Sequence, residues 1–386
     1  MKKKYLVTFS LDKNVAYNKN YILLHQSSID ENFNHVTDYP NYNQLKSNIK
    51  YNEIFFKKNF FKLTKTLNKI HNVNFDLDFW KIFLGPWFEN FTFIIHDRWK
   101  RLFDLKKKEN FNLIKGFNYN NKDFCTNAYE DFLKIIDTDY WNTIVYQKII
   151  EHTKICSVEK VPLVKINQKN KIDHNKIGIG NKINNKALKI FGKRQKYVFF
   201  NTYLPIKNEV IVNLKLKQFP LFRKYFFDAE NYKYNQKIRI KNFKIFGNTK
   251  FEKFLDKIIF LFLPKVFLEG FNDIDKIIAK ENLPKKPNSI LCGIIPNRSH
   301  IMKYLAYQKI KKTKILTIQH GGQSQTLTPD ANFRKKNFEI NLRWSKLKVS
   351  GSKKIYSIGY SKKIYKNSNL KNIYIFLYNH SKYMNK

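Results

Sequence analysis

The feature that most constrains the fold is a strand–helix–strand pattern between residues 289 and 318. Ser289 to Ile294 and Ile315 to Ile318 are short apolar runs, typical of buried strands. Between them, Ser299 to Lys309 carries apolar residues at helical spacing, with Ser299 as the expected N-cap. A strand, a helix and a strand at this spacing form a right-handed βαβ unit of a parallel sheet. The sequence therefore predicts an α/β fold.

Polar residues follow both predicted strands, and they are the candidate site. Carboxyl ends of neighbouring parallel strands meet at the edge where open sheets bind ligands. His320 is a candidate catalytic acid or base, and Gly321 and Gly322 allow a ligand to approach the backbone closely. Arg298 and Ser299 stand at a predicted helix N-terminus, which favours phosphate. The structural alternatives are a polar turn at His320 and a simple helix cap at Arg298 and Ser299.

Helical patterns dominate the first half of the chain. Two short strands, Tyr5 to Ser10 and Tyr21 to Gln26, precede a polar, loop-like stretch over residues 27–50. Tyr51 to His71 is amphipathic, and 129–153 is a further helix. Asp76 to Leu105 is apolar almost all round, so we expect a buried helix pair or a kinked helix. Pro86 marks the break, because proline lacks the amide hydrogen that a helix needs.

The second half is less regular before the βαβ unit. Residues 165–197 are rich in Lys, Asn and Gly, which predicts an exposed loop, and the Gly178-Ile179-Gly180 within it lacks a following helical pattern. Tyr197 to Asn201 and Val210 to Leu216 are expected as strands, and Phe251 to Leu263 as a helix. Two more strands are expected at 354–358 and 373–378.

The charge is extreme, with 73 Lys+Arg against 30 Asp+Glu and a formal net charge of +43. A nucleic-acid or anionic-membrane partner would explain it. Compositional bias would also explain it, because Asn, Ile, Phe and Tyr are over-used together with Lys, and the lysines are spread along the whole chain. The three cysteines are far apart and lack metal-binding spacing, which favours buried thiols in a reducing compartment and no metal site.

Other candidate clusters favour structural roles. A buried Asp97–Arg98 pair beside His96 would be structural unless it faced the cleft, and the same question applies to Glu269. The tryptophans at 80, 87 and 99 are expected in the core. Asp137-Thr138-Asp139 matches the DxD of metal-dependent glycosyltransferases only by letters, because it lies inside a helical pattern. No run of about 18 apolar residues predicts a membrane span.

Several segments resemble a bacterial transferase family found in surface-polysaccharide and lipopolysaccharide gene clusters. They are Phe79 to Arg101, Asp139 to Asn142, Tyr203 to Pro205 followed by Leu216 to Pro220, Phe267 to Phe271, and the QHGG of Gln319 to Gly322. The resemblance implies a GT-B-like glycosyltransferase that is cytoplasmic and peripheral at the inner membrane. Its substrates would be a nucleotide-activated sugar and a glycan or lipid-linked acceptor, with no separate cofactor. It makes His320 the catalytic candidate and Gly321 and Gly322 binding candidates.

The resemblance also sets the expected domains. Residues 1–350 would form an N-terminal Rossmann-like domain with a helical insertion at about 51–160, and 351–386 would begin a C-terminal Rossmann-like domain. Family members extend past the point where this chain ends, so most of the second Rossmann domain is expected to be absent. The chain departs from the family's pattern at Leu24-His25-Gln26, at Gln323-Ser324 and around Trp344. A nucleic-acid-binding protein and a truncated, non-catalytic family fragment remain the alternatives.

Overall fold

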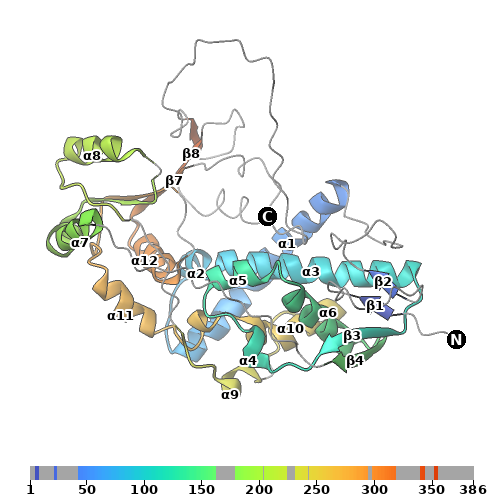
Figure 1. Ribbon diagram of the computed structural model, residues 1–386. Helices are drawn as coiled ribbons and strands as arrows, with labels where there is room; N and C mark the ends of the chain where they lie inside the picture. Colours follow the sequence, from blue (N-terminus) through green and yellow to red (C-terminus); the bar gives the residue numbers. More distant parts are fainter. Residues whose placement is uncertain are drawn as a thin grey trace, which may run out of the picture.

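The computed structural model describes residues 5–7, 21–23, 42–161, 179–202, 204–223, 231–241, 243–293, 298–318, 340–343 and 352–354. Their strands form two parallel sheets, with the orders β2-β1-β3-β4 and β5-β6-β7-β8-β9. Figure 1 shows the two sheets at opposite ends of the molecule, with long helices running between them. The α/β class with parallel strands is therefore confirmed, but the described strands make two sheets where the sequence predicted one.

The first sheet collects short strands from the first 161 residues. It contains β1 (Tyr5–Val7), β2 (Tyr21–Leu23), β3 (Leu113–Phe117) and β4 (Ser157–Val161), all in parallel register. The sequence reasoning missed β3 and β4, because LIKGF and SVEKV are short and interrupted by lysines. Since β3 and β4 pair with each other and β3 with β1, the region around 51–160 supplies half of a sheet as well as helices.

The second sheet contains the predicted βαβ unit. Its strands are β5 (Tyr197–Phe200), β6 (Ser289–Cys292), β7 (Lys314–Ile318), β8 (Ile340–Arg343) and β9 (Ser352–Lys354). Strand β6 pairs with β7 in parallel, and α12 (Ser299–Ile310) connects them, as predicted. Strand β9 pairs with β8 and so extends this sheet. The domain boundary at residue 350 stays a prediction, and the strand expected at 373–378 lies outside the described residues.

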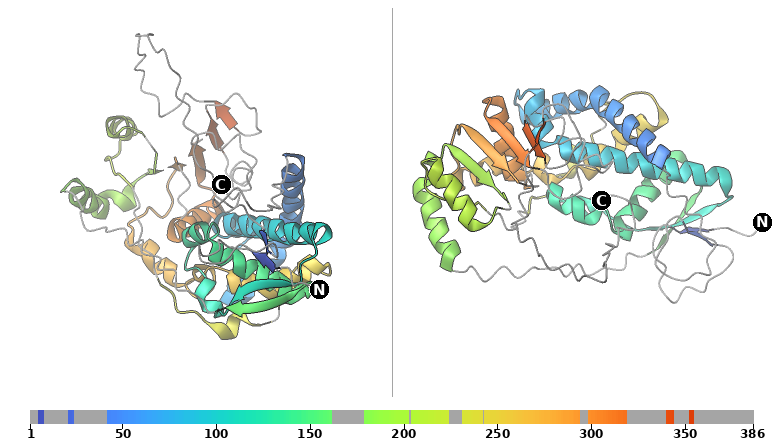
Figure 2. Two further views of the ribbon diagram at one scale, coloured as in Figure 1. Left: turned by 45° about the vertical axis from the view of Figure 1, so that its right-hand side comes forward. Right: turned by 90° about the horizontal axis from the view of Figure 1, so that it is seen from above.

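A layer of three helices joins the two ends of the molecule. Helices α1 (Tyr42–His71), α2 (Leu77–Phe83) and α3 (Gly85–Lys108) cross the space between the sheets (Figure 2). Pro86 lies in the first turn of α3, where its missing amide hydrogen costs nothing, so the predicted break is confirmed. Helix α1 begins nine residues earlier than the polar composition suggested, because the buried Asn48 and Ile49 extend its inner face.

The described residues form eight further helices. They are α4 (Asn121–Phe124), α5 (Tyr129–Ile135), α6 (Asp139–Thr153), α7 (Ile179–Phe191), α8 (Ile206–Lys215), α9 (Gln236–Arg239), α10 (Lys250–Phe262) and α11 (Asp273–Lys280), with 3-10 turns at Gly192–Arg194 and Lys265–Phe267. Within the described residues, no helix is both long enough and apolar enough to cross a membrane.

Three local predictions were wrong. The helix expected over 129–153 is two helices, because the Thr138 hydroxyl accepts from the Trp141 amide and caps α6; Asp137-Thr138-Asp139 therefore lies at a helix junction. The loop expected over 165–197 contains α7, which starts directly after Gly178. The strand expected over 210–216 is part of α8, where the Asn213 side chain donates to the Glu209 carbonyl one turn earlier.

The core is one continuous aromatic-rich cluster, and it contains most of the segments that carry the resemblance. Trp80 and Trp87 are fully buried, and Trp99 packs against the same cluster, as predicted. The ring of Trp80 lies 5.6 Å from that of Phe271, and Phe83 lies 4.9 Å from Phe267. The segments 79–101 and 267–271 therefore pack on each other, which makes them mainly a packing signature.

Candidate functional site

The candidate site is the carboxyl edge of the second sheet, where β5, β6 and β7 end. The three strands run parallel in the order β5-β6-β7, so their carboxyl ends meet at one edge. The Gly293 amide donates to the Phe200 carbonyl at 2.9 Å, which ties the end of β6 to the end of β5. In open parallel sheets this is the edge that binds ligands.

Gly293 is required by the close approach of the two strand ends. A Cβ atom on this residue would lie 1.9 Å from the Asn201 carbonyl oxygen and 2.7 Å from the Thr202 Cα. Asn201 adopts a left-handed conformation with φ of 45°, which turns the chain sharply at the end of β5. The chain therefore leaves both strands within a very small space, and only glycine fits at position 293.

Arg298 is placed at this edge by the helix that follows β6. Its backbone is extended and forms the N-cap of α12, and its carbonyl accepts from the Met302 amide. The buried side chain lies with Nε 3.7 Å from Oε1 of Glu130, in the first turn of α5. Burial raises the pKa of Glu130, and the Arg298 charge opposes that rise. A guanidinium is thus held at a helix N-terminus, an arrangement that suits an anionic ligand.

Two buried hydroxyl groups near the same strand ends lack partners. Within the part of the chain that the structure describes, neither Ser299 Oγ nor Thr317 Oγ1 has a hydrogen-bond partner. Ser299 is the first residue of α12. The prediction that it forms the N-cap was therefore wrong by one position, because Arg298 is the N-cap. Thr317 is opposite Cys292 in the β6–β7 ladder. Buried hydroxyls normally find a partner, so both are available to a bound ligand or to water.

The next residue of α12, His300, is held in its neutral form. Burial lowers its pKa to about 4, and the neighbouring Arg298 charge acts in the same direction. A neutral imidazole can accept a proton or a hydrogen bond, but it adds no positive charge to the edge. The positive charge there therefore comes from Arg298 and from the helix N-terminus.

At the end of β5, a buried pair anchors the next connection. The Thr202 hydroxyl donates to Oε2 of Glu209 at 2.8 Å and accepts from the Leu204 amide. The sequence predicted strands on either side of this connection, over 197–201 and 210–216, and indicated neither residue. It also missed Glu130, which comes from a segment far along the chain. The signal that could have found Thr202 is the polar residue directly after a buried strand.

The structure shows where some of the predicted site residues lie, but it does not test their roles. Arg298 and Ser299 lie at the carboxyl edge, and the pairing of β6 with β7 places the two predicted strand ends side by side. His320, Gly321 and Gly322 follow β7 by two to four residues and lie outside the described residues. Their roles remain predictions.

The Asp97 cluster in the helical layer is structural, as expected. Asp97 accepts from Nη1 of Arg98 at 2.5 Å and from Nε of Arg101 at 2.8 Å, and these cations hold its pKa below its ordinary value despite burial. Nε of Arg98 donates to Asn142, so this pair also joins α3 to α6.

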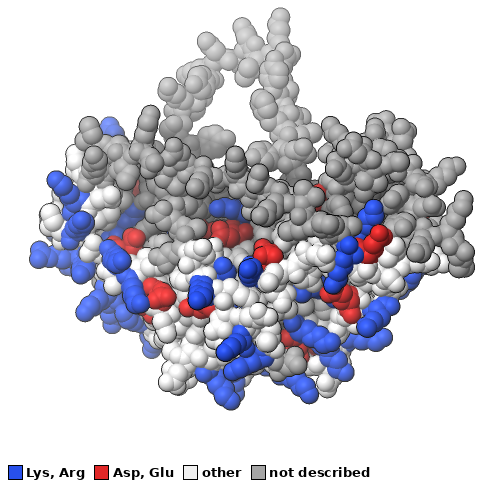
Figure 3. Space-filling view, turned by 60° about the horizontal axis from the view of Figure 1, so that its bottom comes forward, with Lys and Arg blue, Asp and Glu red and all other residues white. Residues whose placement is uncertain are grey.

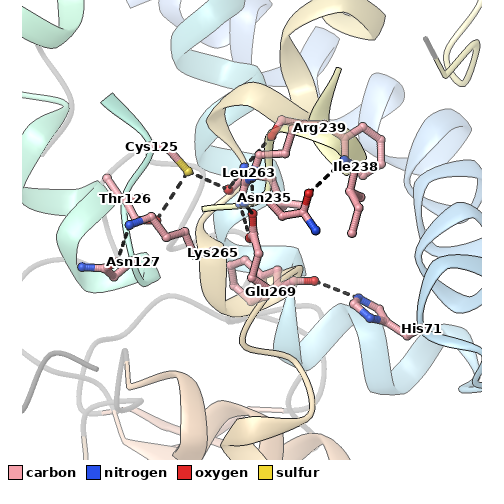
Figure 4. Close-up of polar contacts among 12 residues, drawn as sticks. His71, Cys125, Thr126, Asn127, Asn235, Ile238, Arg239, Leu263, Lys265 and Glu269 are labelled. Carbon is pink, nitrogen blue, oxygen red and sulfur yellow. Dashed lines mark hydrogen bonds and ion pairs between the residues drawn. The ribbon is translucent and has the colours of Figure 1, made fainter. Parts of the chain in front are cut away.

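Glu269 also has a structural role, in a buried ion pair (Figure 4). Its carboxylate forms two bonds with the guanidinium of the buried Arg239, at 2.6 and 2.5 Å. Arg239 also donates to the carbonyls of Phe260 and Leu263 at the end of α10, and the Cys125 thiol lies against the same Leu263 carbonyl. Burial raises the pKa of Cys125 to about 11, so this thiol stays protonated and is a poor nucleophile.

Two further features of the described residues are the charge pattern of one face and the potential metal ligands. On the face drawn in Figure 3, Lys and Arg are spread among Asp and Glu over the described surface and form no single stripe. Within the described residues, no group of three or more His, Cys, Asp or Glu side chains could hold a metal ion.

The chain matches the model of a known protein family. The model of the LIC12162 family transferases matches residues 11–377, which is nearly the whole chain. No curated protein and no solved structure matches the chain.

Proposed function

The chain belongs to the LIC12162 family of transferases, and from this premise we propose that it is glycosyltransferase-like and acts in bacterial cell-surface carbohydrate synthesis. In this proposal it moves a sugar-like group from a nucleotide-activated donor to a glycan or lipid-linked acceptor. The parallel strands would belong to Rossmann-like units of a GT-B-like fold. The reaction would take place in the cytoplasm, with the protein peripheral at the inner membrane.

One observation carries the proposal: Arg298 and the N-terminus of α12 lie at the carboxyl edge of a parallel sheet, beside the strand that precedes His320. The first amides of α12 have no partner within the helix, and the helix dipole favours negative charge there. Arg298 adds a fixed cation, which Glu130 orients. This combination suits the diphosphate of a nucleotide-activated sugar.

The proposed reaction is a direct displacement at the anomeric carbon of the donor. An acceptor hydroxyl oxygen forms the new bond to that carbon, while the bond from the carbon to the diphosphate oxygen breaks. His320 takes the hydroxyl proton, and the nucleoside diphosphate leaves with the bonding electrons. Arg298 and the amides of Ser299, Gly321 and Gly322 stabilise the charge that develops on the leaving group.

The test is nucleoside diphosphate release by the full chain from a panel of nucleotide sugars, with an extracted lipid-linked glycan as acceptor. We expect acceptor-dependent release from at least one donor. We expect His320→Ala to lower turnover roughly 10²- to 10⁴-fold, the usual contribution of a general base, at an unchanged melting temperature. If no donor in the panel is turned over, the donor class is wrong. If His320→Ala turns over like the wild type, the catalytic assignment is wrong.

A further inference from the structure

A pocket lies at the amino edge of the second sheet, opposite the candidate site. Its walls come from the segments that enter β5 and β6 and from the ends of α11 and α12, and its volume is about 620 Å³. All of these segments belong to the described residues. Pockets of roughly 300–1,000 Å³ hold small organic ligands. The pocket is separated from the candidate transfer site by the length of the strands.

The pocket concentrates positive charge beyond the bias of the chain. Six of its 14 lining residues are Lys or Arg, against 73 of 386 in the whole sequence, and none is Asp or Glu. The six are Lys193, Arg194, Lys196, Lys285, Lys286 and Lys311. Within the described part of the chain, no ion pair joins any of them to a carboxylate. Their combined field therefore favours an anion.

Two helix C-termini also point toward this edge. Their partial negative charges balance only part of the positive charge of the lining residues. Helices α11 and α12 run antiparallel to the strands that they flank, so Ile278 and Lys311 near their ends reach the pocket. Each C-terminus is equivalent to about half a negative charge, or roughly one charge for the pair. Six cations exceed this several-fold, so a strong net positive potential remains.

Gln195 provides the second, independent sign of a ligand. It lines the pocket and is only 5% exposed. Its Oε1 accepts two bonds from the guanidinium of Arg223, at 3.2 and 3.0 Å, which fixes the orientation of the amide. Its Nε2 is buried and has no hydrogen-bond partner within the described structure. A buried donor normally finds an acceptor, and an anionic oxygen in the pocket would supply it.

We propose that this pocket binds a small molecule that carries a diphosphate group. The lysines and Arg194 neutralise the two phosphates, and Gln195 donates to one of their oxygens. The half-buried Ile278 and Tyr307, which also line the pocket, offer apolar surface to an attached organic group. The inference goes beyond the proposed transfer reaction, because it concerns another edge of the sheet and other residues.

The first test is isothermal titration of the full chain with inorganic pyrophosphate and with UDP at near-physiological salt. We compare the wild type with the double variant Lys285→Glu, Lys286→Glu and with the control Lys253→Glu, Lys257→Glu. The control pair is also exposed and changes the net charge equally, but it lies on α10. We expect saturable binding that the pocket variant weakens at least about tenfold and the control does not. Absent binding, or equal weakening by both variants, would overturn the proposal.

The second test uses Gln195→Glu, which keeps an oxygen acceptor for Arg223 and replaces the Nε2 donor with an anionic oxygen. We expect about tenfold weaker pyrophosphate binding or more, at an unchanged or higher melting temperature. Arg298→Ala serves as the matched variant at the other edge, and it should leave in place the component of pyrophosphate binding that Gln195→Glu weakens. If Arg298→Ala removes binding and Gln195→Glu does not, pyrophosphate binds at the transfer site and the pocket proposal fails.

Discussion

At the scale of single residues, the Arg239–Glu269 pair shows how a segment that carries the family resemblance serves stability. The Glu269 side chain is 8% exposed and that of Arg239 is fully buried. Glu269 accepts hydrogen bonds from Arg239 of α9 and from the amide of Asn235, which caps α9. Arg239 also donates to two backbone carbonyls at the end of α10. Sequence patterns could not decide whether Glu269 faced the cleft, because its partner lies 30 residues away.

Glu269→Gln should destabilise the protein strongly. The variant removes the charge that balances Arg239 in a buried site, and breaking a buried pair in this way typically costs about 3–5 kcal/mol. Calorimetric unfolding should therefore show a clear fall in the melting temperature. Asp273→Asn is the matched control, because its pair with Lys276 is exposed and such pairs contribute little to stability. Equal effects of the two variants would contradict the structural role of Glu269.

His96 should make stability depend on pH. Burial lowers its pKa from 6.5 to about 4 in the fold, where its ring stacks on Tyr51 with the centroids 4.1 Å apart. The unfolded chain therefore takes up the proton first. The stability that comes from neutral His96 is complete above pH 6.5 and is lost as the pH falls toward about 4.

His96→Phe should remove this dependence while keeping an aromatic ring in place. Relative to wild type, the variant should gain about 1–2 kcal/mol between pH 7.5 and pH 5. Thermal unfolding at the two pH values measures the difference. His71 and His300, whose pKa values burial also lowers to about 4, are present in both proteins and cancel. If the stability difference between the two proteins were the same at both pH values, His96 would have the same pKa in the folded and the unfolded state, which would contradict this prediction.

The residues of the candidate site differ in how far sequence could predict them. Arg298 and Ser299 were predictable, because a strand end and a helix start leave a clear local pattern. Glu130 and Thr317 were not predictable. Glu130 is distinguished by its contact with Arg298, and Thr317 by a buried hydroxyl that has no partner among the described residues, and neither property appears in a local sequence pattern. Gln195 was the least predictable residue. Its bond to Arg223, 28 residues away, fixes the amide so that Nε2 has no partner among the described residues.

At the scale of elements, the junction of β5 and β6 depends on Gly293. Gly293→Ala places a Cβ atom 1.9 Å from the Asn201 carbonyl, so the two strand ends must separate. We expect a loss of about 1–3 kcal/mol or somewhat more, as for other overpacked sites. Chemical denaturation measures it, with Ser289→Ala at the other end of β6 as control. Unchanged stability of Gly293→Ala would mean that the strand ends are less tightly packed than described.

Elements with long apolar periodicity were predicted well, and short ones were not. The helical layer was predicted because its apolar residues repeat over many turns. Residues 210–216 alternate like a strand, yet they form the second half of α8, where buried Glu209 bonds Thr202 and Asn213 bonds back to the Glu209 carbonyl. Side-chain hydrogen bonds between polar residues four and seven positions apart stabilise that helix, and the apolar alternation of the segment does not record them.

At the scale of the whole molecule, two parallel sheets share one aromatic core through the helices between them. Leu6 and Ile114 of the first sheet and Ile290 and Ile315 of the second belong to the same buried cluster. The α/β class was predictable from one βαβ unit. The first sheet was not, because β3 and β4 are brief and lie between helices that dominate the sequence pattern. The Glu130–Arg298 pair links α5 directly to the candidate site.

Amide hydrogen exchange in the presence of the nucleotide sugar that supports turnover tests the central claim most directly. The amides of residues 299–301 precede the first helical bond of α12, which Met302 donates to Arg298, so they should exchange fast in the free protein. We predict that the donor slows these amides and those of residues 320–322 together. Unchanged exchange there, with protection only around residues 193–196 at the amino edge, would contradict a transfer site at the carboxyl edge of the second sheet.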